Sequence, residues 1–273
     1  VYTLIGFLIG AFVTIGISCL IVAARDTVKG SDDILGKLDL RLIGTVNHVN
    51  RKGNQNSPVL ISDKSSGFSF VETFKLIRTK IENFASRENC KTFVITSTLE
   101  DEGKTTVSCN VALALAKNGK SVLLIDGDLR KPAIYKTLGI SAANESGLAG
   151  IINGTKSIAD SVKFVEKYNL FVMLNGTGIP EASEILSSDK MNDIISALEK
   201  EFDYIIIDSA PAGVVADTSI LANSSDAIIL VVKEDKASIR RIRRTIDDLS
   251  NSEKEIVGCI YNSADSGLTS KIK

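Results

Sequence analysis

"STLEDEGKTT" occupies residues 97–106 and decides how the rest of the chain is interpreted. It ends with Gly103, Lys104 and Thr105, as a phosphate-binding loop does, but Thr98 stands where the usual spacing has its first glycine. A β-branched apolar run precedes the stretch, and alanines and leucines at helical spacing come after it. We therefore expect the loop between a strand and a helix N-terminus, where free backbone N–H groups favour an anion.

Three acidic residues, Glu100, Asp101 and Glu102, stand where phosphate groups would approach this loop. Because such a loop binds phosphate through main-chain N–H groups, we expect these side chains to point outward to water. Asp101 also falls where a glycine would ease a positive φ, which aspartate tolerates better than most residues. The alternative is a solvated acidic turn before an ordinary helix, and two further motifs argue against it.

Two more strand-like runs end in aspartates. "VLLIDGDLRKP" at residues 122–132 carries Asp126 and Asp128, and "YIIIDSAP" at residues 204–211 carries Asp208 in the form of a Walker B strand. Ligand sites in parallel sheets lie at the carboxyl ends of the strands. Aspartates at that edge can position the waters of Mg²⁺ or accept a hydroxyl proton. The three motifs together predict a nucleotide site.

The apolar runs predict the fold class. They are continuous rather than alternating, which is typical of strands buried on both faces of a helix-covered parallel sheet. We expect an α/β protein with a doubly wound, mostly parallel sheet and a P-loop. The expected strands are 41–46, 91–97, 121–128, 170–174, 204–211, 227–232 and 255–262, and the expected helices are 70–87, 104–118, 188–202 and 238–250, with a short amphipathic helix before the first strand.

The composition excludes several classes of function. The 273 residues carry a net charge of −1, so we expect no nucleic-acid partner. The single histidine, His48, excludes chemistry that needs a pair of histidines. The four cysteines form no C-x-x-C pair, so neither a zinc site nor a disulfide framework is indicated.

The N-terminal residues 3–24 carry no charge. As a helix they would span ~33 Å, enough to cross a bilayer core, and the alternative of a cleaved signal peptide lacks its basic leading region. Arg25 and Lys29 favour a cytoplasmic position for the residues on the C-terminal side of this segment. The predicted domains are a transmembrane helix at 1–25, a juxtamembrane segment and linker at 26–67, and a P-loop domain at 68–273.

"ITSTLEDEGKTT", "LLIDGDLRKP", "YIIIDSAP" and the strand-ending "YN" together resemble the bacterial tyrosine kinases of capsule and exopolysaccharide systems, over residues 68–263. These kinases are similar in fold to the chromosome-partition and division-site ATPases. Partition ATPases carry an extra lysine early in the loop, and none lies between Ser97 and Lys104, which favours the kinase branch. "AARDTVKGSDDILGKLDLRLIGTV" resembles the end of a polysaccharide co-polymerase, the chain-length determinant to which such kinases are often fused.

The resemblance implies roles for individual residues, with ATP and Mg²⁺ as cofactors. Asn262 would contact adenine, and Asp126 would activate the acceptor hydroxyl with Asp128 close by. The implied nucleotide-binding residues are Asp101, Glu102, Gly103, Lys104, Thr105, Thr106 and Asn262; the implied catalytic residues are Lys104, Asp126 and Asp128; the implied Mg²⁺ ligands are Thr105, Asp126 and Asp208.

The family also carries an E-x-x-R-x-x-R helix that is used in ring assembly. Glu72, Lys75 and Arg78 fit that spacing, with lysine for the first arginine, so we expect self-assembly into a ring. The alternative is an ordinary solvated helix face.

The resemblance implies an ATP-dependent, autophosphorylating protein tyrosine kinase at the cell membrane, with a cytoplasmic catalytic domain. It would act on tyrosine-containing proteins, together with a co-polymerase membrane domain, to regulate polymer synthesis and export. A membrane-tethered partition-type ATPase switch and a nucleotide-binding scaffold remain alternatives. Glu100 and Asp101 replace the family's usual Pro-Gly, and the chain has no tyrosine cluster after Tyr261. The acceptor would then lie in a missing tail or on another molecule, or the protein would be an ATPase switch.

Two basic groups lie near or beyond these motifs. Arg130 and Lys131 come directly after the second aspartate motif and could steer phosphate charge. "SIRRIRRTIDDL" at residues 238–249 carries four arginines that could bind acidic lipid head groups or the acidic surface of a neighbour. An ordinary solvated helix face is the alternative for this second group.

Overall fold

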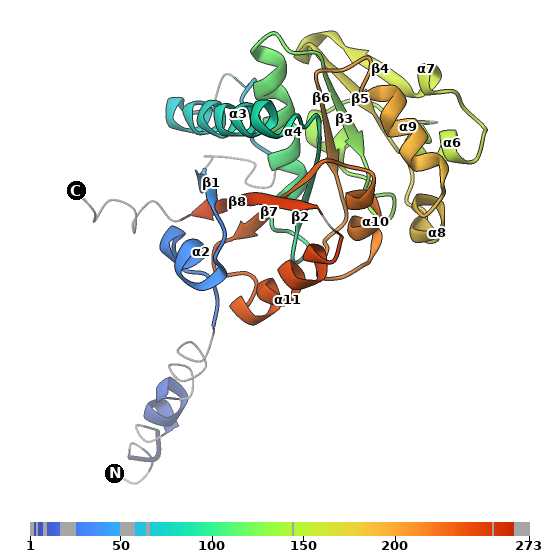
Figure 1. The fold of residues 1–273 in the computed structure, drawn as a ribbon. Coiled ribbons are helices and arrows are strands. Elements are labelled where there is room, and N and C mark those ends of the chain that lie inside the picture. Colours follow the sequence, from blue (N-terminus) through green and yellow to red (C-terminus); the bar gives the residue numbers. More distant parts are fainter. Residues whose placement is uncertain are drawn as a thin grey trace.

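The computed structural model describes residues 3, 5–7, 10–16, 26–49, 58–63, 66–143, 145–252 and 254–264. Within this described part, one eight-stranded sheet has the order β1-β8-β7-β2-β6-β3-β5-β4 (Figure 1). Every neighbouring pair is parallel except β4 and β5. The strands are β1 (Leu42–Asn47), β2 (Thr92–Ser97), β3 (Val122–Asp126), β4 (Val162–Val165), β5 (Leu170–Met173), β6 (Tyr204–Asp208), β7 (Ala227–Lys233) and β8 (Glu255–Ala264).

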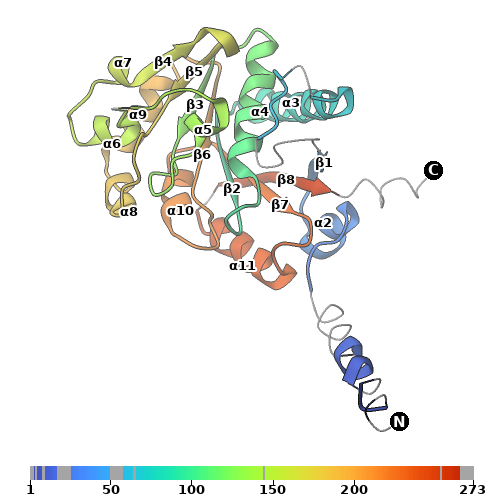
Figure 2. The same ribbon diagram turned by 180° about the vertical axis from the view of Figure 1, so that it is seen from behind.

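Helices cover both faces of the sheet (Figures 1 and 2). One face packs against α3 (Phe68–Glu88), α4 (Lys104–Lys117) and α5 (Ile134–Leu138) in one large apolar cluster. The helices on the other face are α2 (Ser31–Leu38), α6 (Gly147–Ile152), α8 (Ala182–Leu186), α9 (Lys190–Leu198), α10 (Asp217–Asn223) and α11 (Ile239–Ser250), and the short α7 (Ile158–Ser161) and a 3₁₀ turn at Glu166–Tyr168 flank the antiparallel edge.

The central strands explain the doubly wound arrangement. Every residue of β2, β3 and β6 is buried, so each strand needs helices on both sides. The helix α4 comes soon after β2 and is itself buried along most of its length, because its alanines allow close packing against the sheet and α3. Gly119, with φ of 80°, lies just beyond the end of α4 and permits the left-handed turn that stops it.

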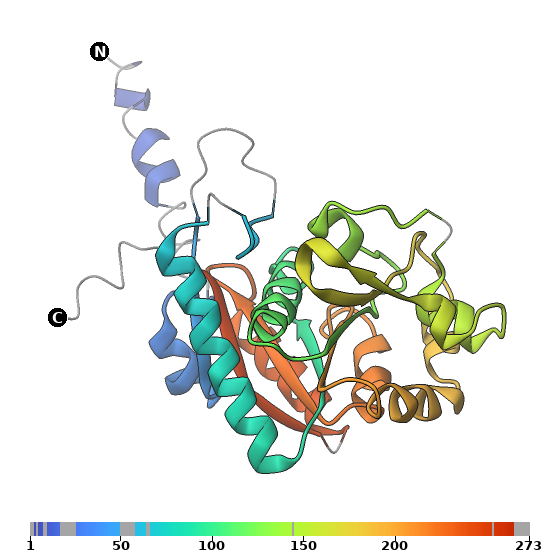
Figure 3. The ribbon, with the colours of Figure 1, turned by 90° about the horizontal axis from the view of Figure 1, so that it is seen from above.

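The segment before the predicted P-loop domain belongs to the same sheet. β1 pairs in parallel with β8, with Val46 opposite Asn262. The helix α3 lies directly on β1 (Figure 3). Gly44 permits this approach, because a Cβ there would come within 2.4 Å of the Ile77 side chain. The guanidinium of Arg243 on α11 donates two hydrogen bonds to the carbonyl of Lys37 at the end of α2.

The seven predicted strands and five predicted helices are confirmed in type, whereas β4 and several short helices between residues 134 and 223 were not predicted. The predicted transmembrane helix within residues 1–25 is not confirmed. In the described part of the chain no helix combines the length and apolar character needed to cross a bilayer, and much of residues 1–25 lies outside the described residues. The domain boundaries at 25 and 67 stay predictions.

Candidate active site

The loop between β2 and α4 takes the geometry that its sequence predicts. Asp101 has a φ of 62° and Gly103 a φ of 88°, so the expectation of a positive φ at Asp101 is confirmed. A Cβ at Gly103 would lie 2.2 Å from Nδ2 of Asn262, which donates a hydrogen bond of 2.8 Å to the Glu102 carbonyl. The end of β8 therefore holds the loop in place, and only glycine leaves room for that contact.

The three acidic side chains do not all point to water as expected. Glu100 and Asp101 are exposed, but Glu102 is fully buried. Its carboxylate accepts hydrogen bonds from the Leu99 N–H at 2.5 Å and from the Lys233 N–H at 3.4 Å. Burial raises its pKa to about 7, opposed by these N–H donors. The outward orientation was thus wrong for Glu102, whose side chain joins the loop to β7.

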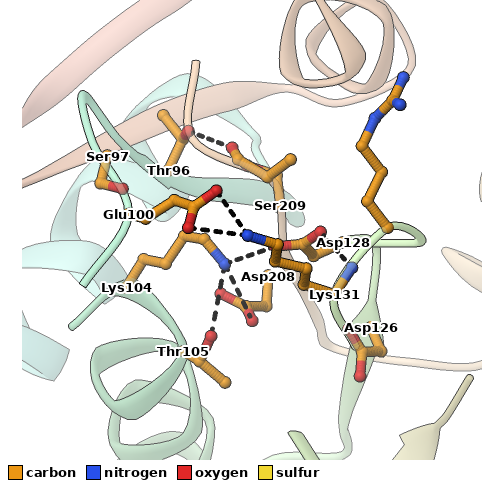
Figure 4. A network of polar contacts seen from close by, with 12 residues as sticks. Thr96, Ser97, Glu100, Lys104, Thr105, Asp126, Asp128, Lys131, Asp208 and Ser209 are labelled. Atoms are coloured by element: carbon orange, nitrogen blue, oxygen red, sulfur yellow. Dashed lines mark hydrogen bonds and ion pairs between the residues drawn. The ribbon is translucent and has the colours of Figure 1, made fainter. Parts of the chain in front are cut away.

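Lys104 is the centre of a buried charge cluster (Figure 4). Its Nζ lies 2.9 Å from Oδ2 of Asp128 and 3.9 Å from Oδ2 of Asp208, and only 11% of the side chain is exposed. Burial alone would lower the pKa of Lys104, but the negative charges of Asp208 and Asp128 outweigh it and raise that pKa. Ser108 donates a hydrogen bond of 3.0 Å to the other Asp208 oxygen. The three predicted motifs therefore meet at one point.

Asp126 lies at the end of β3 beside this cluster and is completely buried. Burial, and next the negative charge of Asp208, raise its pKa well above the ordinary value. One of its oxygens accepts a long hydrogen bond from the Ile134 N–H, and the other has no hydrogen-bond partner. Asp128, not Asp126, lines the adjacent cavity. The structure thus brings both predicted aspartates to the site, and of the two only Asp128 lines the larger cavity.

The unpartnered oxygens fit a hard cation. Oδ1 of Asp126 and Oδ2 of Asp208 are buried without a hydrogen-bond partner, and the Thr105 hydroxyl lies 3.4 Å from the Lys104 ammonium. Within the described residues, no group of three or more His, Cys, Asp or Glu could hold a metal by itself. Mg²⁺ commonly keeps several waters and takes phosphate oxygens as ligands, so an incomplete protein shell is what a nucleotide-dependent site requires.

Two cavities flank the loop. A cavity of about 280 Å³ lies over Lys104 and Thr105, and its walls include Asp128 and Pro211. A second, of about 200 Å³, lies on the other side of the loop between the ends of β1 and β8 and the start of α3. Gly103 and Thr106 border both, and Asn262 borders the second. The predicted phosphate ligands and the predicted adenine contact thus line adjoining spaces.

Arg130 belongs to a network of hydrogen bonds and an ion pair that the sequence did not predict. Its guanidinium forms a two-pronged ion pair with the fully buried Asp217, at 2.7 and 3.1 Å, and donates to the Pro180 carbonyl and the Ser183 hydroxyl. Asp217 belongs to no recognisable motif and lies 87 residues from Arg130 along the chain, so only the fold reveals the pair.

Lys131, by contrast, reaches back across the site to the loop. Its ammonium lies 2.8 Å from both carboxylate oxygens of Glu100, and both side chains are exposed (Figure 4). This ion pair joins the two segments that bound the mouth of the larger cavity.

The predicted assembly residues lie on α3 and have partners within their own chain. Lys75 pairs with Glu72 at 2.7 Å, and Arg78 pairs with Glu82 at 3.5 Å. Nothing in this arrangement tests ring formation, which stays a prediction.

Comparisons with known proteins agree with this geometry. A family model described as an AAA domain matches residues 91–258. The tyrosine-protein kinase CpsD of Streptococcus pneumoniae is 34% identical over 194 residues, which cover 71% of this chain and 84% of that protein. The tyrosine-protein kinase ptk of Acinetobacter johnsonii is 26% identical over 267 residues, covering 95% of this chain but 36% of that protein. The solved kinase domain of the Escherichia coli tyrosine kinase ETK matches with a TM-score of 0.76 and 25% identity, covering 87% of this chain and 95% of that one.

Proposed function

This chain belongs to the bacterial tyrosine-protein kinases, and we propose that it transfers the γ-phosphoryl group of ATP to tyrosine hydroxyls in the control of capsule or exopolysaccharide synthesis and export. The observation that carries the proposal is the Lys104 ammonium, held by Asp128 and Asp208 at the N-terminus of α4. A cation and free backbone N–H groups at one helix start suit a phosphate chain. Phosphoryl transfer asks little more of a protein than positioning and charge neutralisation.

In this proposal one part of the nucleotide binds in each of the two cavities. The triphosphate would bind in the larger cavity against Lys104, Thr105 and the loop N–H groups, and the adenine would bind in the smaller one near Thr106 and Asn262. When phosphate enters, Lys104 exchanges its carboxylate partners for phosphate oxygens. That exchange would leave Asp128 free to accept a hydrogen bond from the tyrosine hydroxyl.

In the transfer, the phenol oxygen bonds to the γ-phosphorus as the bond to the β,γ-bridging oxygen breaks, and ADP leaves with that electron pair. The phenol proton passes to a carboxylate. Asp128 faces the cavity, and Asp126 is the predicted proton acceptor behind it, with a pKa raised by burial and by Asp208. Mg²⁺, when bound through Thr105, Asp126 and Asp208, supplies positive charge to the phosphates.

A membrane anchor and a partner complete the proposed function. Residues 3–24 carry no charge, and the alignment with the longer ptk protein spans nearly all of this chain. We therefore propose that this part of the chain attaches the kinase to the cell membrane beside a co-polymerase domain, with the catalytic domain in the cytoplasm. We also propose ring assembly through the α3 face that carries Glu72, Lys75 and Arg78.

The acceptor tyrosine is proposed to lie on another molecule. Among the described residues Tyr168, Tyr204 and Tyr261 are buried, and Tyr135 is partly buried. The three buried tyrosines are not open acceptors in the folded protein. The same observation is also compatible with one alternative function, an ATPase switch that hydrolyses ATP.

The test is phosphosite mapping by mass spectrometry after incubation with Mg²⁺-ATP and a tyrosine-rich peptide, with Lys104→Met as the control. Phosphotyrosine that depends on Lys104 is the expected result. ADP release without phosphotyrosine on protein or peptide would reject the kinase and favour the ATPase switch. Full phosphotransfer by Lys104→Met would reject the assigned site itself.

A further inference from the structure

We propose that a groove beside the phosphate cavity binds acidic residues that flank the acceptor tyrosine, so that the preferred substrates are tyrosines in acidic segments. This inference rests on the proposed kinase function, because it names the substrate class of that same site. The groove lies between the start and middle of α11 and the loop after β6. Its cavity volume is about 620 Å³, larger than either cavity at the phosphate loop.

The charge of the groove is strongly positive. Arg240, Arg241 and Arg244 line it, with Asp248 as the single carboxylate of the lining. All three arginines are exposed, and within the part of the chain that the structure describes none of them forms an ion pair with a carboxylate. Arg241 makes one hydrogen bond of 3.4 Å, to the carbonyl of Gly213 across the groove. Such guanidinium groups suit carboxylates, which they can bind with two parallel hydrogen bonds.

The fourth arginine of the helix faces away from the groove. Arg243 lies between Arg241 and Arg244 in sequence but points to α2, where it donates two hydrogen bonds to the Lys37 carbonyl. The helix spacing therefore separates one structural arginine from three that face the groove or solvent.

The groove is continuous with the phosphate cavity. Val214 and Val215 line both, so a peptide whose tyrosine enters the phosphate cavity leaves along this surface. Val214 is 50% exposed and so offers an apolar surface for an aromatic ring. An acidic residue a few positions from the tyrosine then meets Arg241 or Arg244.

Acidic lipid head groups are the other ligands that such arginines could bind. The continuity with the phosphate cavity favours a peptide, because a flat bilayer cannot follow the groove past Val214 to Lys104. The two possibilities also differ in what the arginines control. A peptide site sets the choice of substrate, whereas a lipid site sets attachment to vesicles.

The experiment compares two dodecapeptides with one central tyrosine, flanked by glutamates in one and by glutamines in the other. Binding is measured by fluorescence anisotropy without nucleotide, and phosphorylation as kcat/KM with Mg²⁺-ATP. The groove variant is Arg241→Gln/Arg244→Gln. The matched control is Arg87→Gln/Lys200→Gln, which removes two exposed positive charges elsewhere. Two solvent-exposed ion pairs between the peptide and the arginines predict that the wild type prefers the acidic peptide by about 5- to 20-fold. The groove variant should lose this preference, and the control variant should keep it.

The two arms separate failure of this inference from failure of the proposed function. Equal binding of both peptides, or an unchanged preference in the groove variant, overturns the acidic-substrate site whatever the chemistry. Acidic-peptide binding that depends on the arginines, without Lys104-dependent phosphotyrosine, would instead reject the kinase. If the groove variant lost binding to phosphatidylglycerol vesicles or changed oligomer size while its peptide preference stayed, the groove would be a lipid or subunit contact and the inference would be wrong.

Discussion

Replacing Lys104 by methionine should destabilise the folded protein as well as abolish phosphoryl transfer. Lys104 is the cation nearest to Asp128 and Asp208, whose side chains are 6% and 0% exposed. Asp126, also buried, is the third carboxylate of the cluster. Methionine fills much of the volume of lysine but leaves these carboxylates without the positive charge that lies nearest to them. Removing one member of a buried ion pair costs about 3–5 kcal/mol.

The loss of stability in Lys104→Met should depend on pH. The Lys104 charge lowers the pKa of Asp208, which burial already raises above its ordinary value. Without Lys104 that pKa rises further, so the folded variant binds protons more tightly than the unfolded chain does. A group with a raised folded pKa contributes stability at low pH that is lost as pH rises through that pKa. The variant should therefore approach the wild type in stability as pH falls from 7.5 to 5.5.

The assay is thermal unfolding by circular dichroism at both pH values, without nucleotide. At pH 7.5 the expected loss is roughly 6–20 °C in Tm, from about 2–4 °C per kcal/mol for a domain of this size. Lys104→Met/Asp128→Asn removes one of the unpaired carboxylates and should recover part of the loss. A single variant as stable as the wild type at pH 7.5, or a difference that does not narrow at pH 5.5, would refute the charge-cluster argument.

Three further predictions concern residues around the loop. Glu102→Gln should flatten the pH dependence of stability. The pKa of Glu102 is about 7 in the folded protein against an ordinary value of 4.5, which gives roughly 3 kcal/mol of stability that is present below pH 4.5 and lost as pH rises to about 7. Urea unfolding at four pH values measures this, and equal pH dependence of the free energy of unfolding in wild type and variant would contradict it. Asp217→Asn should lower stability by about 1–3 kcal/mol and reduce kcat/KM for ATP, since Arg130 loses its two-pronged partner. Arg130→Lys should have the same two effects, measured by thermal unfolding and steady-state kinetics. If neither variant changed stability or kcat/KM, the ion pair would have no role in folding or in ATP use. Glu100→Gln should lower the KM for ATP about two- to threefold at low salt, because it removes a negative charge at the cavity mouth and releases Lys131; an effect that persists in 0.5 M salt would point to geometry instead of charge.

Local sequence determined much of the fold and the site. The continuous apolar runs predicted seven strands because parallel strands buried on both faces must be apolar throughout. The positive φ of Asp101 was predicted from the loop spacing alone. These features depend on neighbouring residues along the chain, so a pattern can carry them.

The meeting of the three motifs at one edge of the sheet was predicted, but side-chain partners supplied by other distant segments were not. The buried Glu102 carboxylate accepts from the Lys233 N–H of β7 in addition to the local Leu99 N–H, and Arg130 pairs with Asp217 of α10. Glutamate beside a phosphate loop and arginine beside a phosphate cavity both favour solvent or ligand on chemical grounds. In the folded protein, both side chains instead bind partners from distant segments, which the spacing of neighbouring residues cannot predict. The antiparallel β4 was missed for a related reason, since its four residues are partly exposed and give no continuous apolar run.

The same distant contacts explain how a loop with acidic residues in place of Pro-Gly keeps a phosphate-binding shape. Asn262 holds the Glu102 carbonyl, and the Glu102 carboxylate holds the N–H groups of Leu99 and Lys233. The loop is thus fixed from the ends of β7 and β8, and β8 is in turn flanked by β1 through the Val46–Asn262 register. Because the loop's main chain is held in this way, Asp101 can face water and Glu100 can pair with Lys131 without disturbing the N–H groups at the start of α4. The N-terminal strand therefore supports the loop in two steps, although none of the loop residues belongs to it: β1 pairs with β8 through the main chain, and the Asn262 side chain of β8 holds the Glu102 carbonyl.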